Sequence, residues 1–201
     1  MEALEAKVIQ LFAVVAEDLE RATQALLGGT DVLDLVMERE RFVDALVAEI
    51  EASATRQFAR QAPVATDLRF LLSVLRVGPE LERSHDLVVH LAREARHADG
   101  GDLPPRIRGL IQQMGDVSSA MWRDAADSWY ERDGSAAEAL EARDDDLDAL
   151  HYAFKLQLAS GGVNLAGTMR MILVGRFYER LGDHAVNVAA RVAYLAGRPD
   201  S

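Results

Sequence analysis

Apolar side chains recur at three- and four-residue steps along nearly the whole chain, and this periodicity constrains the fold more than any other feature. Residues three and four apart share one face of an α-helix, whereas a half-buried strand alternates with period two, a pattern not sustained here. Glycine, proline and short polar runs divide the chain into segments at about 3–27, 31–61, 63–98, 107–132, 135–158 and 163–195. The sequence therefore predicts an all-α fold of six helices.

The two halves of the chain repeat each other. Glu82 and Asp86 correspond to Glu179 and Asp183 at an offset of 97 residues. The sequence FVDAL, ending at residue 46, corresponds to DLDAL, ending at residue 150. Glycine and proline cluster between the halves without apolar periodicity. We therefore expect two tandem three-helix bundles, residues 1–98 and 105–201, joined by a linker of about 99–104.

Each half carries two acidic pairs with four-residue spacing, one on its second predicted helix and one on its third. The pairs are Glu40 and Asp44, Glu82 and Asp86, Asp144 and Asp148, and Glu179 and Asp183. Four residues on a helix bring both carboxylates to one face, about 6 Å apart along the axis, where like charges repel. Such pairs are typical of solvated helix faces, but antiparallel neighbours could also join two pairs into a four-carboxylate metal site. Oxygen ligands of this kind suit Mg, Mn or Fe, and Ca in looser geometry.

The amino-acid composition excludes several classes of binding partner and of metal or catalytic site. The 201 residues include 33 acidic and 22 basic side chains, for a net charge of −11, which argues against nucleic acid as the main partner. The chain has no cysteine, which excludes disulfides, thiolate metal sites and cysteine nucleophiles. The N-terminal sequence lacks the features of a secretory signal, and no apolar run approaches the roughly 18 residues of a membrane span. We therefore expect a cytoplasmic protein.

Two other interpretations of the acidic residues stay open. A ferritin-like di-iron carboxylate protein needs two Glu-x-x-His motifs on different helices of one bundle, but Glu82-x-x-His85 and Glu94-x-x-His97 share one predicted helix. A metal-independent adaptor could instead use its acidic faces to bind a basic partner surface. Retained metal after purification distinguishes the adaptor from a metal protein.

The sequence resembles the PhoU family, the phosphate-signalling regulators built from two tandem three-helix bundles. The resemblance rests on QAPVATDLR at 61–69, LERSHD at 81–86 and GRFYERLGDHAVNVA at 175–189. PhoU proteins bear E(D)xxxD motifs that bind multinuclear metal clusters on each bundle. The resemblance therefore implies Fe, Mn, Mg or Zn bound at the motif residues, which are Glu40, Asp44, Glu82, Asp86, Asp144, Asp148, Glu179 and Asp183.

The resemblance also implies a function without catalysis. It implies a negative regulator of the phosphate regulon and of phosphate uptake, which relays phosphate status between the high-affinity phosphate ABC transporter and a sensor histidine kinase. It further implies a homodimer that contacts the membrane only through these partners.

Three further residues are candidate additional ligands. The first half reads ERSHD where the family usually has ERIGD, so His85 replaces a glycine and could crowd the neighbouring bundle or supply an imidazole. His90 follows Asp86 by four residues and shares its predicted face. Asp67 either stabilises the first turn of a helix or serves as a ligand. Pro79, inside the third predicted helix, is expected to kink it.

Overall fold

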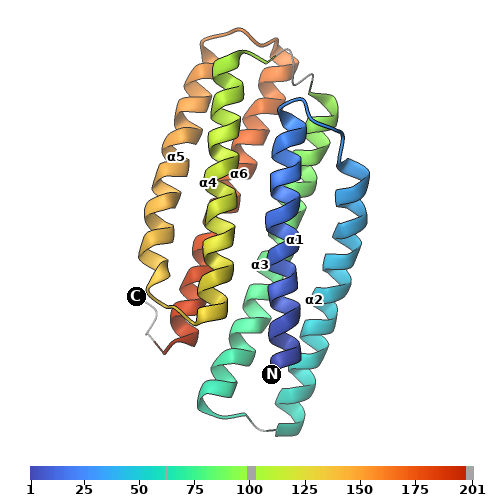
Figure 1. Ribbon diagram of the computed structural model, residues 1–201, viewed down its shortest axis with the longest axis vertical. Coiled ribbons are helices and arrows are strands. Elements are labelled where there is room, and N and C mark those ends of the chain that lie inside the picture. Colours follow the sequence, from blue (N-terminus) through green and yellow to red (C-terminus); the bar gives the residue numbers. More distant parts are fainter. Residues whose placement is uncertain (62, 99–102, 198–201) are drawn as a thin grey trace.

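The computed structural model describes residues 1–61, 63–98 and 103–197, and over these residues the protein is all-helical (Figure 1). The helices are α1 (Glu2–Leu26), α2 (Leu33–Gln61), α3 (Ala65–His97), α4 (Pro105–Glu131), α5 (Ala136–Ala159) and α6 (Leu165–Leu195). The predicted all-α fold is confirmed, and every predicted helix end lies within two residues of an observed one. Residues 99–102 of the predicted linker lie outside the described residues. None of the described helices combines the length and apolar character needed to cross a membrane.

Local sequence signals set the helix ends. The Asp31 carboxylate accepts a backbone N–H two residues later, at 2.9 Å, at the beginning of α2. The Asn164 side chain accepts a backbone N–H three residues later, at 2.8 Å, and so caps α6. Pro79 does not end α3, which continues through it for a further 18 residues to His97.

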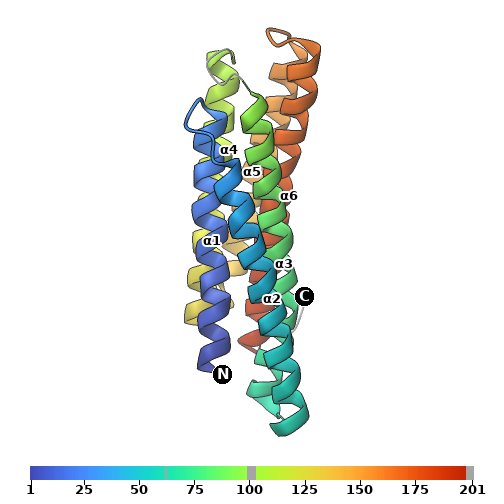
Figure 2. The same ribbon diagram turned by 90° about the vertical axis from the view of Figure 1, so that its right-hand side faces the viewer.

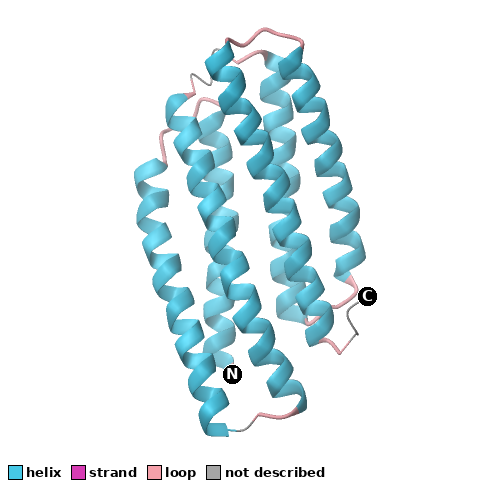
Figure 3. Cartoon of the chain, turned by 180° about the vertical axis from the view of Figure 1, so that it is seen from behind, coloured by secondary structure: helices cyan, strands magenta, loops and turns pink. Residues whose placement is uncertain are grey.

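The six helices form two three-helix bundles that lie side by side (Figure 1). α1, α2 and α3 form the first bundle, and α4, α5 and α6 form the second. α1 packs against α4, and α3 packs against α6, so α2 and α5 lie on the two outer sides. The molecule is elongated along its helices (Figure 2), and α2, α3, α6 and α5 lie next to one another across one broad face (Figure 3).

A continuous core joins the bundles. Trp122 and Trp129 of α4 are fully buried, and their ring centroids lie 6.2 and 6.4 Å from that of Phe12 on α1. Tyr178 of α6 is also buried, and its hydroxyl lies 2.7 Å from Oγ1 of Thr23 on α1. Because these contacts cross from one bundle to the other, the two repeats are held together by packed side chains as well as by the chain between them.

Gly115 of α4 marks a close approach between the bundles, and replacing it should destabilise the protein. A Cβ there would overlap Cγ2 of Thr23 and lie 2.8 Å from its Oγ1. Thr23 cannot easily move, because its hydroxyl donates to the Leu19 carbonyl at 2.8 Å and contacts Tyr178. Gly115→Ala should therefore lower the free energy of unfolding by about 1–3 kcal/mol through overpacking.

Gly109, on the same helix, provides the matched control. A Cβ at Gly109 meets no atom within 4 Å, so Gly109→Ala should raise the free energy of unfolding by up to about 1 kcal/mol through helix propensity. Urea unfolding of both variants measures the difference. Equal stabilisation by both substitutions would contradict the close packing of α1 and α4.

Candidate metal centre

A dense group of carboxylates lies between α5 and α6. Asp144 and Asp148 belong to α5, and Glu179 and Asp183 belong to α6. Their charges act on one another, since Asp183, Asp148 and Glu179 all contribute to raising the pKa of Asp144. The two acidic pairs of the second half therefore meet across antiparallel helices. We call these four residues, together with His151, the α5/α6 cluster.

Three members of the α5/α6 cluster have ligand atoms close together. Those of Asp148, His151 and Glu179 all lie within 4.8 Å of one another. His151 is buried, Glu179 is half-buried and Asp148 is exposed, so the group lies at the edge of the bundle. Oε2 of Glu179 is buried without a hydrogen-bond partner among the described residues. Two carboxylates and an imidazole are a ligand set that fits Fe, Mn or Zn.

The environment favours a neutral His151 imidazole and disfavours a charged Glu179 carboxylate that lacks a cation. Burial, followed by the positive charges of Lys155 and Arg176, lowers the pKa of His151, against the opposing effect of Asp148. A neutral imidazole at pH 7 keeps a nitrogen lone pair available for a metal. Burial raises the pKa of Glu179, and the carboxylates of Asp183 and Asp148 add to this effect, whereas Arg176 opposes it. Arg176 forms an ion pair with Glu179.

Asp144 is the most strongly perturbed carboxyl group of the α5/α6 cluster. Burial and then the charges of Asp183 and Asp148 raise its pKa to about 6. The pKa rises because the charged form is poorly solvated and lies beside other negative charges. A cation in the cluster would compensate this charge, since a bound ion is commonly the largest local charge in such a site.

Gly182 allows α5 and α6 to approach at the α5/α6 cluster. A Cβ at this position would overlap Oδ1 of Asp144 and lie 2.7 Å from Cδ2 of Leu147. Any larger residue would displace the Asp144 carboxylate and the Leu147 side chain. The glycine of the ERLGD sequence therefore leaves room for both beside α6.

A second group of carboxylates lies between α2 and α3. It contains Asp44 and Glu51 of α2 with Glu82 and Asp86 of α3, and we call it the α2/α3 cluster. Burial and then Asp44, Asp86 and Glu51 raise the pKa of Glu82. Glu40 is half-buried one helical turn before Asp44.

The two clusters differ in composition. At the offset of 104 residues that relates Asp44 to Asp148, the positions of His151 and Lys155 are taken by Val47 and Glu51. The α2/α3 cluster therefore offers carboxylates without an imidazole. Of the two, the α5/α6 cluster is the better candidate for a borderline transition metal.

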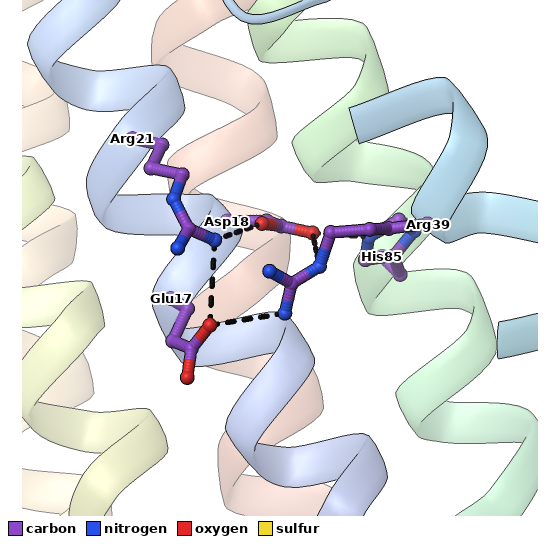
Figure 4. Close-up of polar contacts among 5 residues, drawn as sticks. All are labelled: Glu17, Asp18, Arg21, Arg39 and His85. Atoms are coloured by element: carbon purple, nitrogen blue, oxygen red, sulfur yellow. Dashed lines mark hydrogen bonds and ion pairs between the residues drawn. The ribbon is translucent and has the colours of Figure 1, made fainter. Parts of the chain in front are cut away.

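His85 lies against α1 rather than among the carboxylates of the α2/α3 cluster. Its ring is buried, with Nε2 at 3.0 Å from Oδ2 of Asp18 (Figure 4). Asp18 is itself fully buried and is paired with Arg21 at 2.7 Å and with Arg39 of α2 at 3.0 Å. The imidazole that was a candidate ligand thus takes part in a network that ties together all three helices of the first bundle.

The other two candidate ligands, His90 and Asp67, have different roles in the structure. His90 is exposed and stacks on Phe177 of α6, with ring centroids 5.3 Å apart, so it contributes to the contact between the bundles. Asp67 is in the first turn of α3, where its charge favours the helix dipole. It precedes Glu82 by about 22 Å along the helix axis, too far to share an ion.

The sequence interpretation missed His151. Its signal was present, because Asp148 and His151 are three residues apart and therefore share a face of α5. The motif considered for histidine ligands was Glu-x-x-His, and here the acidic residue is an aspartate.

Several curated proteins similar to this chain are named as phosphate-transport accessory proteins. "Phosphate-specific transport system accessory protein PhoU homolog 2" of Mycobacterium tuberculosis is 35% identical over 186 residues, which span 89% of this chain and 85% of that protein. "Phosphate-specific transport system accessory protein PhoU homolog 1" of Mycobacterium leprae is 34% identical over 183 residues, which span 89% and 82%. A PhoU homolog of Deinococcus radiodurans is 32% identical over 195 residues, which span 92% and 89%.

Two solved structures share the fold of this chain, and a family model matches its sequence. PhoU from Pseudomonas aeruginosa superposes with a TM-score of 0.90 at 24% identity, covering 96% of this chain and 95% of that one. The phosphate transport system regulatory protein PhoU from Streptococcus pneumoniae gives a TM-score of 0.87 at 23% identity, covering 96% and 93%. A PhoU domain model matches residues 8–95 and 111–192, one match in each repeat. This chain belongs to the PhoU family.

Proposed function

We propose that this protein is a negative regulator of the phosphate regulon and of phosphate uptake, which relays phosphate status between the high-affinity phosphate ABC transporter and a sensor histidine kinase. Family membership and the names of the relatives support a role in regulating phosphate uptake. We add to this role two proposals: that the protein relays phosphate status to the kinase, and that this relay depends on bound metal. The α5/α6 cluster carries this proposal, because it gathers four carboxylates and an imidazole at the surface of the second bundle.

Asp148, His151 and Glu179 would hold the ion in the α5/α6 cluster. The imidazole favours Fe, Mn or Zn, while an all-carboxylate site such as the α2/α3 cluster suits Mg or Mn better. A bound cation would supply positive charge to a crowded acidic surface. Asp144 and Asp183 add negative charge around these ligands, and Arg176 holds Glu179 through their ion pair.

In this proposal the clusters determine the charge that a partner meets. The residues bind a cation and a protein surface, and no turnover is involved. We further propose that the protein acts in the cytoplasm as a homodimer and reaches the membrane through the transporter. Without metal, the same acidic surfaces would serve as a plain adaptor for a basic partner.

The regulatory function is tested in cells of the source organism that lack the gene. A reporter of the phosphate regulon should become active in high phosphate after deletion and return to its repressed level with the wild-type gene. The variant Asp148→Asn/Glu179→Gln should restore repression only partly although it folds. An unchanged reporter after deletion would contradict the proposed function.

Metal retention is the direct biochemical prediction. After purification without a metal-affinity column, Asp148→Asn/Glu179→Gln should lose the metal of the α5/α6 cluster. Its affinity should fall at least as much as the roughly 10–100-fold that loss of an outer-shell partner costs. The charge-matched control Glu138→Gln/Asp146→Asn changes two exposed residues of α5 and should keep its metal.

Elemental analysis before and after dialysis against a chelator measures both variants. Equal metal content in the wild type and in Asp148→Asn/Glu179→Gln would contradict the assignment of these ligands. Absence of metal from every sample would favour the acidic adaptor.

The raised pKa of Asp144 predicts how stability depends on pH. Its pKa is about 6 in the folded protein against 3.8 ordinarily, so between these values the folded state binds more protons than the unfolded state. The contribution of Asp144 to the free energy of unfolding of metal-free protein should therefore fall as pH rises through this range, with the full penalty present above about pH 6. At pH 7, Asp144→Asn should be more stable than the wild type by about 1 kcal/mol, since the partly solvated group is screened.

Urea unfolding in chelator at pH 4 and pH 7 checks this prediction. The gain from Asp144→Asn should appear at pH 7 and vanish at pH 4. Asp146→Asn, an exposed neighbour on α5, should show no such change. A gain of the same size at both pH values would contradict the electrostatic cause.

A further inference from the structure

The hairpin of α5 and α6 exposes a group of large apolar side chains beside the α5/α6 cluster. Their exposed fractions range from 46% to 77%. Monomeric soluble proteins rarely leave such a group uncovered, and exposed groups of this kind mark interaction sites. We call them the apolar tip, which consists of Tyr152 and Leu156 on α5 and Leu165, Met169, Ile172 and Leu173 on α6.

The apolar tip and the acidic residues follow one another along each helix. On α6, Leu165, Met169 and Ile172 are followed by Arg176, Glu179 and Asp183, with steps that alternate between four and three residues. This alternation is the heptad spacing with which one helix packs along another. On α5, Tyr152 and Leu156 continue at four-residue steps from Asp144 and Asp148. Both helices therefore present a stripe that is apolar towards their connecting loop and acidic towards the middle of the bundle.

Part of the apolar tip is particular to the second bundle. The positions in the first bundle that correspond to Tyr152 and Leu156 are Ala48 and Ala52. At the offset of 97 residues, Leu173 corresponds to Arg76, whereas the other three tip residues of α6 correspond to leucines that are half-buried. The second bundle therefore has three apolar side chains that the first lacks, and it exposes three that the first half-buries.

The charges next to the apolar tip leave a negative surface. Two nearby cations have partners within the chain, since Lys155 lies 6.0 Å from the Tyr152 ring centroid and Arg176 pairs with Glu179. Asp148 and Asp183 are exposed, and neither forms an ion pair with another described residue. A matching surface would therefore place basic side chains beside its apolar ones.

The same charges disfavour two other occupants. A bilayer with anionic lipids would be repelled by the acidic part of each stripe. A second copy of the chain, docked isologously on this face, would bring a second set of the same carboxylates into the contact.

We propose that the apolar tip and the α5/α6 cluster together form a docking surface for a helix of a partner protein, one whose apolar stripe continues into lysine or arginine. The inference rests on the proposed function in one respect, since metal in the α5/α6 cluster would compete with the partner's basic side chains. Docking itself needs no metal, so the two proposals can fail separately.

Two synthetic helical peptides with an identical leucine stripe, one with lysine and one with glutamate at its flanking positions, serve as probes. Fluorescence anisotropy with the full chain in chelator should show the lysine peptide binding at least about tenfold more tightly at low salt. Leu165→Ser/Met169→Ser should weaken its binding by about tenfold or more, because two anchoring side chains lose their apolar contacts. Both residues are exposed, so this variant should unfold at the wild-type urea midpoint.

Two further variants separate the apolar and charged contributions. Asp148→Asn/Asp183→Asn should weaken the lysine peptide and reduce the salt dependence of its binding. Leu35→Ser/Phe42→Ser removes exposed apolar side chains of α2, at 46% and 42% exposure, and should bind the peptide like the wild type.

Several outcomes would overturn the proposal. Equal affinity for the two peptides, or full binding by Leu165→Ser/Met169→Ser, would remove the basic helix as occupant. A wild-type dimer that this variant converts to a monomer, measured by light scattering, would assign the apolar tip to a second copy. Cosedimentation of the wild type, but not of the variant, with phosphatidylglycerol vesicles would assign it to a membrane.

Discussion

Repulsion among the carboxylates held between α5 and α6 is the constraint on which the candidate site depends. Four acidic side chains meet there, and Arg176 and Lys155 provide the nearby positive charge. Burial, together with this repulsion, raises the pKa of Asp144. A fold that keeps such a group together gives up some stability, and binding of a cation or of a basic partner would recover it. Gly182 strengthens this argument, because its missing side chain is what allows Asp144 so close to α6.

The first bundle uses the corresponding position differently. Where the second bundle has Gly182, the first has His85, whose ring pairs with the buried carboxylate of Asp18. Arg21 and Arg39 complete this network through ion pairs, so the buried charge is compensated by partners from three helices. The first repeat thus has a charged network in its interior besides the α2/α3 cluster, whereas the second repeat adds an imidazole to its carboxylates. This difference makes the second bundle the better candidate for metal and partner binding.

Much of the fold and part of the site could be predicted from the sequence. Apolar periodicity and helix-ending residues located all six helices, because both act over a few residues. Four-residue spacing placed Asp144 with Asp148, and the antiparallel packing expected of neighbouring helices indicated that the pairs of α5 and α6 could meet. The partner of His85 could not be predicted, since Asp18 is 67 residues away in sequence and meets it only through the packing of α1 on α3. The stacking of His90 on Phe177 depends in the same way on how the two bundles are joined.

The central claim is that the α5/α6 cluster binds a cation through Asp148, His151 and Glu179. Anomalous diffraction from crystals of the full chain loaded with Mn²⁺ tests it most directly, because it locates the ion without relying on a variant. The account predicts an anomalous peak between these three side chains, on the outer side of α5 and α6. Manganese bound only in the α2/α3 cluster, or none bound by the protein, would contradict it.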